Sequence, residues 1–474
     1  MRVYLINPSN PVVSLTKSTR WNKLNKYRVW KPLGLMTLAR LTPDDWELRI
    51  IDENLGPVDY EALPRPDLVG LTAFTSQATR AYELARKFRM RGVPTVIGGI
   101  HASMCVDEAL HFFDAVVTGE AERQWGRVLE DVRHRRLQRL YEGGLVPVEE
   151  IPPARHDLLP GQYFVGSLQT TRGCPLRCTF CSVTAFNGGQ FRHRPTENVL
   201  EDLRQIREKI ILFVDDNLIG TRKDHVARTK ELFRAMIREK LTTPWICQAT
   251  INFADDEELL KLARRAGCMG VFIGFESATE EGLVAVHKKF NIQKGRDFRR
   301  SVRCIQQHGI HVTASFIIGI DTDGPGASRL IAEACEAYGV GSANLLVLTP
   351  LPGTELYREM EAQRRIVACS YPDDWRYYTL SHPVAAYKNF NWRELVEEVC
   401  YFHDIFYSYP KILRRVLSNA AINWRTPWPV LLTLIANLTY RYNHLANRRV
   451  LADRLEDDRP VTPPILGRAD ATLR

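Results

Sequence analysis

Apolar runs of strand length alternate with helical segments along most of this chain, and this alternation constrains the fold more than any other feature. In the first 125 residues the strand-like runs are VYLIN, WELRIID, DLVGLTAF, PTVIGG and AVVTGE, and the helical segments include PLGLMTLARL and TRAYELARKFRMRG. Strands that alternate with helices form parallel sheets. The pattern therefore predicts a doubly wound, Rossmann-like α/β domain over residues 1–132.

A second, longer alternation follows a linker. Basic and then proline-rich sequence over residues 133–161 separates the two parts and is rich in turn-forming residues. From Gln162 six strand-like runs recur: YFVGSLQTT, IILFVDD, PWICQAT, GVFIGFES, VTASFIIG and ANLLVLT. Six such units predict a partial (β/α)6 barrel of the TIM type over residues 162–368, with its chemistry at the carboxyl ends of the strands. Aromatic-rich sequence then predicts a helical C-terminal region over residues 369–474.

The composition is that of a folded globular chain. Of 474 residues, 45% are hydrophobic and 25% are charged, and 64 Lys and Arg against 55 Asp and Glu give a net charge of +9. This excess is mild for the length and is not typical of a nucleic-acid binder. The first residues lack the pattern of a secretory signal. The apolar stretch at residues 426–440 is shorter than the ~20 residues that span a bilayer. Because most of the ten cysteines are scattered, no disulfide framework is implied, and we expect a cytoplasmic protein.

Three cysteines lie close together directly after the first predicted barrel strand. The segment TTRGCPLRCTFCS places Cys174, Cys178 and Cys181 in a C-x3-C-x2-C array. A structural zinc site needs four ligands, and no fourth cysteine follows at close spacing, so His193 would be the nearest candidate. Three thiolates suit a cubane iron–sulfur cluster in which one iron stays open to a further ligand. The array therefore predicts a 4Fe–4S cluster, with a zinc knuckle as the alternative.

This array, with the aromatic Phe180 before its last cysteine and a six-unit β/α pattern around it, resembles the radical S-adenosylmethionine (SAM) superfamily over about residues 162–354. The resemblance implies that the open iron binds the methionyl end of SAM and that one electron from the cluster cleaves SAM to a 5′-deoxyadenosyl radical. It also implies an electron donor such as flavodoxin or ferredoxin. The residues expected to contact SAM are Phe180, Asp216, Gln248, Glu276 and Ser277.

The strand ends leave alternatives open. Glu276 and Ser277, in FESATEEGL, look like the family segment that contacts the ribose or amino end of SAM, but Glu276 could instead cap the next helix. Asp215, Asp216 and Asn217 form the segment FVDDN where many members have a glycine-rich segment, and they too could be helix caps. This substitution recurs in the subgroup that resembles methylthiotransferases and cobalamin-dependent members.

The N-terminal domain resembles the cobalamin-binding domain that precedes the barrel in one subgroup of the superfamily. The segments VGLTAFTSQATRAYELARKFR, VIGGIHAS and VVTGEAE carry this resemblance, within about residues 2–123. Glycines after a strand let the backbone approach a large flat ligand, and hydroxyl groups can bond its amide or phosphate groups. The expected cobalamin contacts are Thr72, Thr75, Ser76, Gly98, Gly99, His101, Gly119 and Glu120.

One position departs from that pattern. Cobalamin domains of the methionine-synthase type have D-x-H-x-x-G with histidine as the lower cobalt ligand, and the comparable stretch here is DENLG, with Asn54 in place of the histidine. An amide is a poor replacement for an imidazole. Either cobalamin binds without a protein ligand, or the domain has lost the cofactor and persists as a scaffold. His101 could likewise be a loop histidine bonded to the backbone.

The C-terminal region is locally basic. Residues 405–450 contain seven Lys or Arg and no Asp or Glu. Trp424 and Trp428 lie beside basic residues, and an apolar helical pattern follows at Leu431, Leu434, Ile435 and Leu438. This combination predicts a peripheral contact of residues 405–450 with the inner face of an anionic membrane. A helix packed on the barrel with solvated charges is the alternative, and no aromatic–basic platform for nucleic acid is present in the sequence.

Together these features predict an enzyme. The favoured reading is cobalamin-dependent C-methylation of a lipid-like, tetrapyrrole or other secondary-metabolite substrate by radical SAM chemistry. A cobalamin-free radical SAM cyclase or rearrangement enzyme is the alternative of the same class; a methylthiotransferase should carry a second cysteine set in the N-terminal domain, which has only Cys105. The alternative of a different class is a non-catalytic iron–sulfur binding protein. The sequence identifies no catalytic side chain and no individual substrate.

Overall fold

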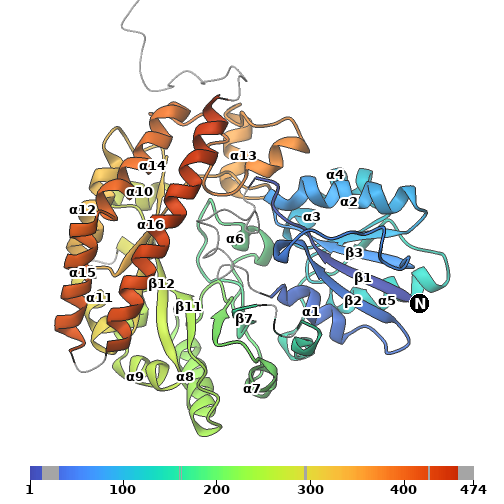
Figure 1. Ribbon diagram of the computed structural model, residues 1–474, viewed down its shortest axis with the longest axis horizontal. Helices are drawn as coiled ribbons and strands as arrows, with labels where there is room; N and C mark the ends of the chain where they lie inside the picture. Colours follow the sequence, from blue (N-terminus) through green and yellow to red (C-terminus); the bar gives the residue numbers. More distant parts are fainter. Residues whose placement is uncertain (13–30, 160, 162, 293–295, 425–426, 457–474) are drawn as a thin grey trace, which may run out of the picture.

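The computed structural model describes residues 1–12, 31–159, 161, 163–292, 296–424 and 427–456. Outside the described residues lie the predicted boundary residue Gln162, Pro160 of the predicted linker, and residues 457–474. Two six-stranded parallel sheets lie beside each other, with helices around both and a third, helical region against the larger unit (Figure 1). The predicted α/β fold class is confirmed.

The N-terminal sheet has the order β2-β1-β3-β4-β5-β6, and all its described pairs are parallel. The strands are β1 (Arg2–Asn7), β2 (Glu47–Asp52), β3 (Leu68–Thr72), β4 (Thr95–Gly98), β5 (Ala115–Thr118) and β6 (Leu140–Glu142). The chain order reverses between β1 and β3, and ligands of such sheets bind beyond the carboxyl ends of the strands at this reversal. Strand β6 falls in the predicted linker and extends the sheet by one edge strand.

Two groups of helices cover this sheet because successive strand residues point to opposite faces. Val3 and Leu5 of β1 pack in one core with α1 (Leu33–Arg40) and α5 (Glu122–Arg133). Tyr4 and Ile6 pack in the other core with helices of the opposite face. Those helices are α2 (Ala78–Met90), α3 (Ile100–Met104) and α4 (Val106–Phe112), and short 3₁₀ turns lie at Glu53–Leu55 and Thr75–Gln77.

The second sheet runs in chain order, β7-β10-β11-β12-β13-β14, and every described neighbour pair is parallel. Its strands are β7 (Val165–Leu168), β10 (Ile210–Phe213), β11 (Trp245–Ala249), β12 (Cys268–Glu276), β13 (His311–Ile318) and β14 (Ser342–Val347). All six predicted strands are present. A small antiparallel pair, β8 (Thr171–Arg172) and β9 (Arg192–His193), holds the loop that carries the three cysteines.

Amphipathic helices separate these strands, as the alternation predicts. They are α6 (Ser182–Asn187), α7 (Thr196–Gln205), α8 (Lys223–Arg238), α9 (Glu257–Arg265), α10 (Glu280–Ala285), α11 (Phe298–Gln307), α12 (Ala327–Tyr338) and α13 (Glu355–Ala362). Side-chain caps fix several starts: Asp256 accepts from the backbone N–H of Leu259 at 2.8 Å and Thr279 accepts from that of Gly282 at 3.1 Å. Such caps satisfy amides that have no partner inside the helix.

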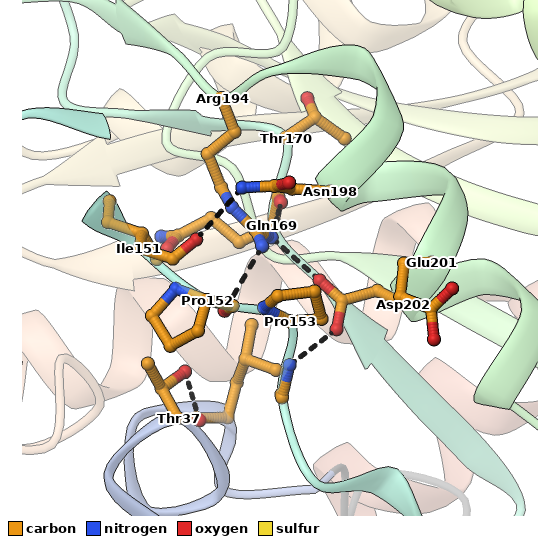
Figure 2. A network of polar contacts seen from close by, with 12 residues as sticks. Thr37, Ile151, Pro152, Pro153, Gln169, Thr170, Arg194, Asn198, Glu201 and Asp202 are labelled. Atoms are coloured by element: carbon orange, nitrogen blue, oxygen red, sulfur yellow. Dashed lines mark hydrogen bonds and ion pairs between the residues drawn. The ribbon is translucent and has the colours of Figure 1, made fainter. Parts of the chain in front are cut away.

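A buried polar contact, here called the Asp202 clamp, fastens the segment between the two units to the barrel (Figure 2). Asp202 on α7 accepts from the backbone N–H of Ala154 at 2.7 Å and from Arg194 Nη1 at 2.8 Å. Arg194 also donates to the carbonyl of Gln169 at 2.7 Å. Because the Asp202 and Arg194 side chains are almost fully buried, these bonds are shielded from water. They attach the segment around Ala154 to the barrel.

The C-terminal helices pack on β13 and β14, at one edge of the barrel sheet, and lie on the side of the barrel away from the N-terminal sheet (Figure 1). The C-terminal region begins with a 3₁₀ turn at Asp373–Tyr377 and continues through α14 (Trp392–Phe406), α15 (Tyr409–Ile422) and α16 (Pro427–Glu456). The predicted helical character of this region is therefore correct. None of the helices in the described part of the chain combines the length and the hydropathy needed to cross a bilayer.

Candidate functional site

The three cysteines lie on one loop between β8 and α6, at the carboxyl end of the first barrel strand. Cys178 is buried, and Cys174 and Cys181 are partly buried. Burial raises the pKa of Cys178 to about 12, and burial is also the first cause that raises the pKa of Cys174 and of Cys181. With nothing bound, the protein therefore favours neutral thiols, and a cationic metal centre would be needed to stabilise the thiolates.

The segment FVDDN after β10 supports this loop with three successive side chains. The fully buried Asp215 accepts from the backbone N–H and hydroxyl of Thr170, at 2.9 and 3.0 Å, and from Thr171. Asp216 accepts from the backbone N–H of Gly173 at 3.2 Å. Asn217 Nδ2 donates to Thr250 and lies 3.9 Å from Cys174 Sγ. None of the three caps the following helix, so the capping alternative does not describe them.

A buried ion pair formed by the end of β12 and the segment after α10 lies near the cysteine loop. Lys288 Nζ lies 3.0 Å from Glu276 Oε1, and both side chains are nearly fully buried. Burial lowers the pKa of Lys288, but the Glu276 carboxylate, and the Cys178 and Cys174 sulfurs when they are ionised, outweigh it and raise this pKa above its usual value. Thr279 rather than Glu276 caps α10. Sequence reasoning identified Glu276 but missed Lys288, because a single lysine beyond a short helix carries no recognisable pattern.

The other predicted SAM contacts lie around the same strand ends. The Gln248 side chain is exposed on β11. Phe180 packs at the edge of the barrel core. Ser277 is buried and its Oγ accepts from the backbone N–H of Thr279 at 3.1 Å, which is a local turn contact. Their roles toward SAM stay predictions.

The donor set of the loop fits an iron–sulfur cluster. Three soft thiols lie on this loop, near the buried ammonium of Lys288, and cubane clusters take cysteine thiolates. His193, the candidate fourth zinc ligand, packs its ring against Phe191 and His225, with centroids 4.9 and 5.7 Å away. Within the described ranges, no group of three or more His, Cys, Asp or Glu side chains converges on one metal ion. The structure thus offers no four-ligand zinc site in those ranges. The thiolates of a cubane cluster bind different irons and need not converge in this way.

A cavity of about 480 Å³ lies where the N-terminal sheet meets the cysteine loop. The carboxyl ends of β3, β4 and β5 form one wall, through residues that include Thr72, Gly98, Gly99 and Gly119. Gly173, Ser182 and Asp216, which flank the cysteines in space, form the opposite wall. The rest of the lining is mainly apolar and includes Leu35, Leu71, Ile100, Trp125 and Phe186. The two candidate binding regions therefore share one cavity.

Five of the eight predicted cobalamin contacts line this cavity: Thr72, Gly98, Gly99, Gly119 and Glu120. Thr75, Ser76 and His101 are not part of its lining. His101 is buried behind the wall, where its Nε2 lies 2.9 Å from Tyr82 Oη and 3.6 Å from Glu108 Oε1. Thr75 and Ser76 sit in the 3₁₀ turn before α2. The structure therefore places these three residues outside the cavity lining, and their contact with cobalamin stays a prediction. Phe74, which is exposed and lines the cavity, was not predicted.

Glu120 joins the two units across this cavity. It lies 2.5 Å from Arg192 Nη2 and 3.3 Å from Arg172 Nη1, and it accepts from the backbone N–H of Val146 at 2.5 Å. Although burial opposes the change, the two guanidinium groups hold the pKa of Glu120 below its usual value. Glu120 is therefore an ionised interdomain contact in the cavity wall.

The cavity wall fits a large planar ligand. A methyl group added at Gly99 would come within 2.5 Å of Thr72 Oγ1, so at this position the wall has no room for a side chain. Asn54 is not in the lining. Its Nδ2 instead donates to Asp52 Oδ1 at 2.8 Å and to the carbonyl of Pro8 at 3.3 Å. The position that replaces the usual cobalt ligand thus belongs to a turn, and it offers no donor to the cavity.

Two protein families match separate parts of the chain. Residues 168–326 match the Radical SAM superfamily, and residues 24–128 match the B12 binding domain. The matches fall on the two regions that the sequence identified and in the same order. They confirm the predicted resemblance, together with the cofactors that it implies, a 4Fe–4S cluster, SAM and cobalamin.

Several curated proteins are similar over most of the chain. The hopanoid C-2 methylase of Rhodopseudomonas palustris is 27% identical over 350 residues, which cover 71% of this chain and 65% of the relative, just under two thirds of its length. The bacteriochlorophyllide d C-12(1)-methyltransferase of Chlorobaculum tepidum is 26% identical, with 83% and 86% covered. The bacteriochlorophyllide d C-8(2)-methyltransferase of the same organism is 26% identical, with 89% and 97% covered.

Solved structures share the fold. The cobalamin-dependent SAM radical enzyme OxsB, solved with aqua-cobalamin and SAM, superposes with a TM-score of 0.65 at 15% identity over 96% of this chain and 80% of that one. The radical SAM methyltransferase TsrM from Kitasatospora setae, solved with cobalamin and a 4Fe–4S cluster, gives 0.59 at 19% identity over 76% and 78%. At these identities the likeness concerns the arrangement of the domains.

Proposed function

We propose that this chain, whose residues 168–326 match the Radical SAM superfamily and whose residues 24–128 match the B12 binding domain, transfers a methyl group to a carbon atom of a lipid-like or tetrapyrrole substrate. The observation that carries the proposal is the shared cavity. Its walls join the glycine-lined edge of the N-terminal sheet to residues that flank the three cysteines, so ligands of the two domains would meet in one space.

The chain's own residues supply binding, orientation and exclusion of water. A bound cluster with SAM supplies a carbon-centred radical, and cobalamin supplies a methyl carrier. Cys174, Cys178 and Cys181 would hold the cluster, and the Lys288 ammonium would balance part of its negative charge. Thr72, Gly98, Gly99 and Gly119 would hold the corrin face. The apolar lining keeps water away from reactive intermediates.

The substrate class rests on two supports. Most residues that line the cavity are apolar, although charged groups such as Lys31, Glu120, Glu122, Arg172 and Asp216 also reach it; the apolar part of the lining suits a hydrophobic substrate. The similar proteins named above are methylases whose names give hopanoid and bacteriochlorophyllide substrates. An apolar ligand buried in such a lining gains about 25 cal/mol for each Å² removed from water.

The test uses anaerobically reconstituted protein with cluster and cobalamin, a chemical reductant, and SAM labelled in its methyl group. Substrates are a hopanoid, a chlorophyllide and a polar amino acid. We expect 5′-deoxyadenosine and S-adenosylhomocysteine to form together with a labelled apolar product. Deoxyadenosine with an unlabelled, rearranged product would instead show the cobalamin-free cyclase class. Failure to form deoxyadenosine with any substrate, from protein that retains its cluster, would show a non-catalytic binding protein.

A further inference from the structure

The long helix α16 turns polar side chains toward the barrel and apolar ones outward. Thr433 and Asn437 are fully buried. Thr433 Oγ1 lies 3.0 Å from His311 Nδ1, and Asn437 Nδ2 donates to the carbonyl of Gly341 at 2.7 Å. The outward residues Leu431, Leu434 and Ile435 are exposed. A surface helix of a globular protein has the opposite arrangement, so α16 presents an apolar face that no described part of this chain covers.

Helix α15 continues this apolar face. Leu413 and Leu417, one helical turn apart, are 58% and 59% exposed, and Trp424 beyond the helix is 74% exposed. The two helices pack along each other (Figure 1), and Arg441 of α16 places its guanidinium 4.4 Å from the ring centroid of Tyr409 of α15. We call the exposed set Leu413, Leu417, Trp424, Trp428, Leu434 and Ile435 the hairpin face.

A cationic cavity opens beside the hairpin face. It has a volume of about 360 Å³ and lies between α11, α12 and α15. Five Lys and Arg side chains line it, against one carboxylate, Glu336, which pairs with Lys411 at 2.5 Å. Among the residues that the structure describes, Arg299, Arg303 and Arg414 have no carboxylate partner. Three unpaired guanidinium groups around one cavity form a site for anionic oxygens.

We propose that the hairpin face and this cavity dock the protein on an anionic lipid surface. The leucines and tryptophans of α15 and α16 would enter the boundary between headgroups and acyl chains, and Arg299, Arg303 and Arg414 would bind lipid phosphates beside them. The inference concerns a different part of the molecule from the interdomain cavity, and it holds whether or not the proposed methylation is correct.

The observations favour a lipid surface over a second copy of the chain. Residues 405–450 contain seven Lys or Arg and no acid, so two hairpin faces placed together would repel each other. Exposed leucines, tryptophans near the end of the hairpin and adjacent unpaired cations together are typical of interfacial helices. An anionic bilayer is the partner that matches both the apolar and the cationic parts.

The experiment is flotation of the full-length protein with vesicles of phosphatidylcholine alone and of phosphatidylcholine with phosphatidylglycerol. We expect binding to the anionic vesicles at low salt and release as ionic strength rises. The variant R299Q/R303Q/R414Q should bind about a hundredfold more weakly, since each cation near an anionic surface is worth about fivefold in affinity. The variant L413S/L417S/L434S should bind more weakly at every salt concentration, because it lacks the apolar contribution.

Matched controls separate this contact from general effects of charge and surface. R86Q/R238Q/R358Q removes three exposed arginines from other helices, and L330S removes an exposed leucine from α12. Both should bind as the wild type does. Equal weakening in control and hairpin variants, or wild-type protein that does not float at low salt, would overturn the proposal. A dimer in light scattering that L413S/L417S/L434S dissociates, without vesicle binding, would assign the face to a second copy and also overturn it.

Discussion

Two adjacent glycines in the cavity wall should differ in how much an alanine substitution lowers the stability of the N-terminal sheet. Gly99 has φ 89° and ψ −176°, a backbone region that is essentially restricted to glycine and costs other residues about 1–3 kcal/mol. A methyl group there would also lie 2.5 Å from Thr72 Oγ1, and displacing that side chain from its rotamer costs about 0.5–1.5 kcal/mol. Gly99→Ala should therefore destabilise the N-terminal sheet by about 2–4 kcal/mol.

Gly98 is the matched control because it lines the same cavity with an ordinary backbone conformation. A methyl group added there meets only Val117, with its carbonyl oxygen 3.5 Å away. Gly98→Ala should change the stability by less than about 1 kcal/mol. It should nevertheless lower the amount of corrin that the protein retains after gel filtration, since the methyl group projects beside the cavity.

Amide hydrogen exchange at β3 and β4 measures this difference without treating the whole chain as one unfolding unit. Exchange should be about thirty- to a thousandfold faster in Gly99→Ala than in the wild type, and almost unchanged in Gly98→Ala. Equal exchange in the two variants would refute the argument from backbone conformation. Full corrin retention by Gly98→Ala would show that corrin does not approach this wall.

Three further predictions concern the barrel and the helices on it. Burial lowers the pKa of His311 to about 4, so the contribution of the neutral ring to stability is complete above pH 6.5 and is lost as the pH falls, by about 2 kcal/mol at pH 5. His311→Asn should remove this part of the acid sensitivity of amide exchange in α16. An unchanged pH dependence in that variant would contradict the prediction. Glu276→Gln should leave the iron content intact but weaken SAM binding about ten- to a hundredfold in calorimetry. Lys288→Met should lower the iron content because it leaves Glu276 buried and unpaired. Equal iron content in the two variants would argue against a role for the Lys288 ammonium. Changing Cys174, Cys178 and Cys181 together to Ala should remove iron and sulfide in parallel, and stoichiometric zinc in anaerobic wild-type protein would contradict the cluster.

Periodicity predicted five strands of the N-terminal sheet and all six strands of the barrel sheet, but not the short edge strand β6. Strand β6 has three residues, and of these only Tyr141 is buried. Such a strand shows neither an apolar run nor a clear alternation, and its existence depends on pairing with β5. The C-x3-C-x2-C array could be identified from the sequence because its spacing alone indicates a cluster-binding site.

Positions close in sequence to a predicted site did not always reach it. Gly99 lines the cavity, but α3 begins at the next residue and carries His101 behind the wall to Tyr82 and Glu108. Lys288 shows the opposite case, since it follows Glu276 by twelve residues and meets it only after α10 folds back. Sequence spacing predicts which residues share a strand end, but not where a turn sends the next side chain.

The sequence of α16 also did not predict that its polar side would be buried. Thr433 and Asn437 are polar residues one turn apart, and polar residues on a helix normally indicate its solvent side. Here they satisfy groups of the barrel instead, with His311 and Gly341 as partners. The apolar stripe at Leu431, Leu434 and Ile435 was predicted correctly as a stripe. Only the fold reveals that it faces outward.

The Asp202 clamp sets an order of events during synthesis. The N-terminal sheet is complete once β6 has left the ribosome, but the backbone N–H of Ala154 lacks its acceptor until Asp202, about fifty residues later, has emerged. Domains fold in the order in which they are made. Before then the nascent chain presents only one wall of the cavity, because Gly173 and Asp216 belong to the other. A cofactor that needs both walls can therefore be captured only after the barrel has begun to form.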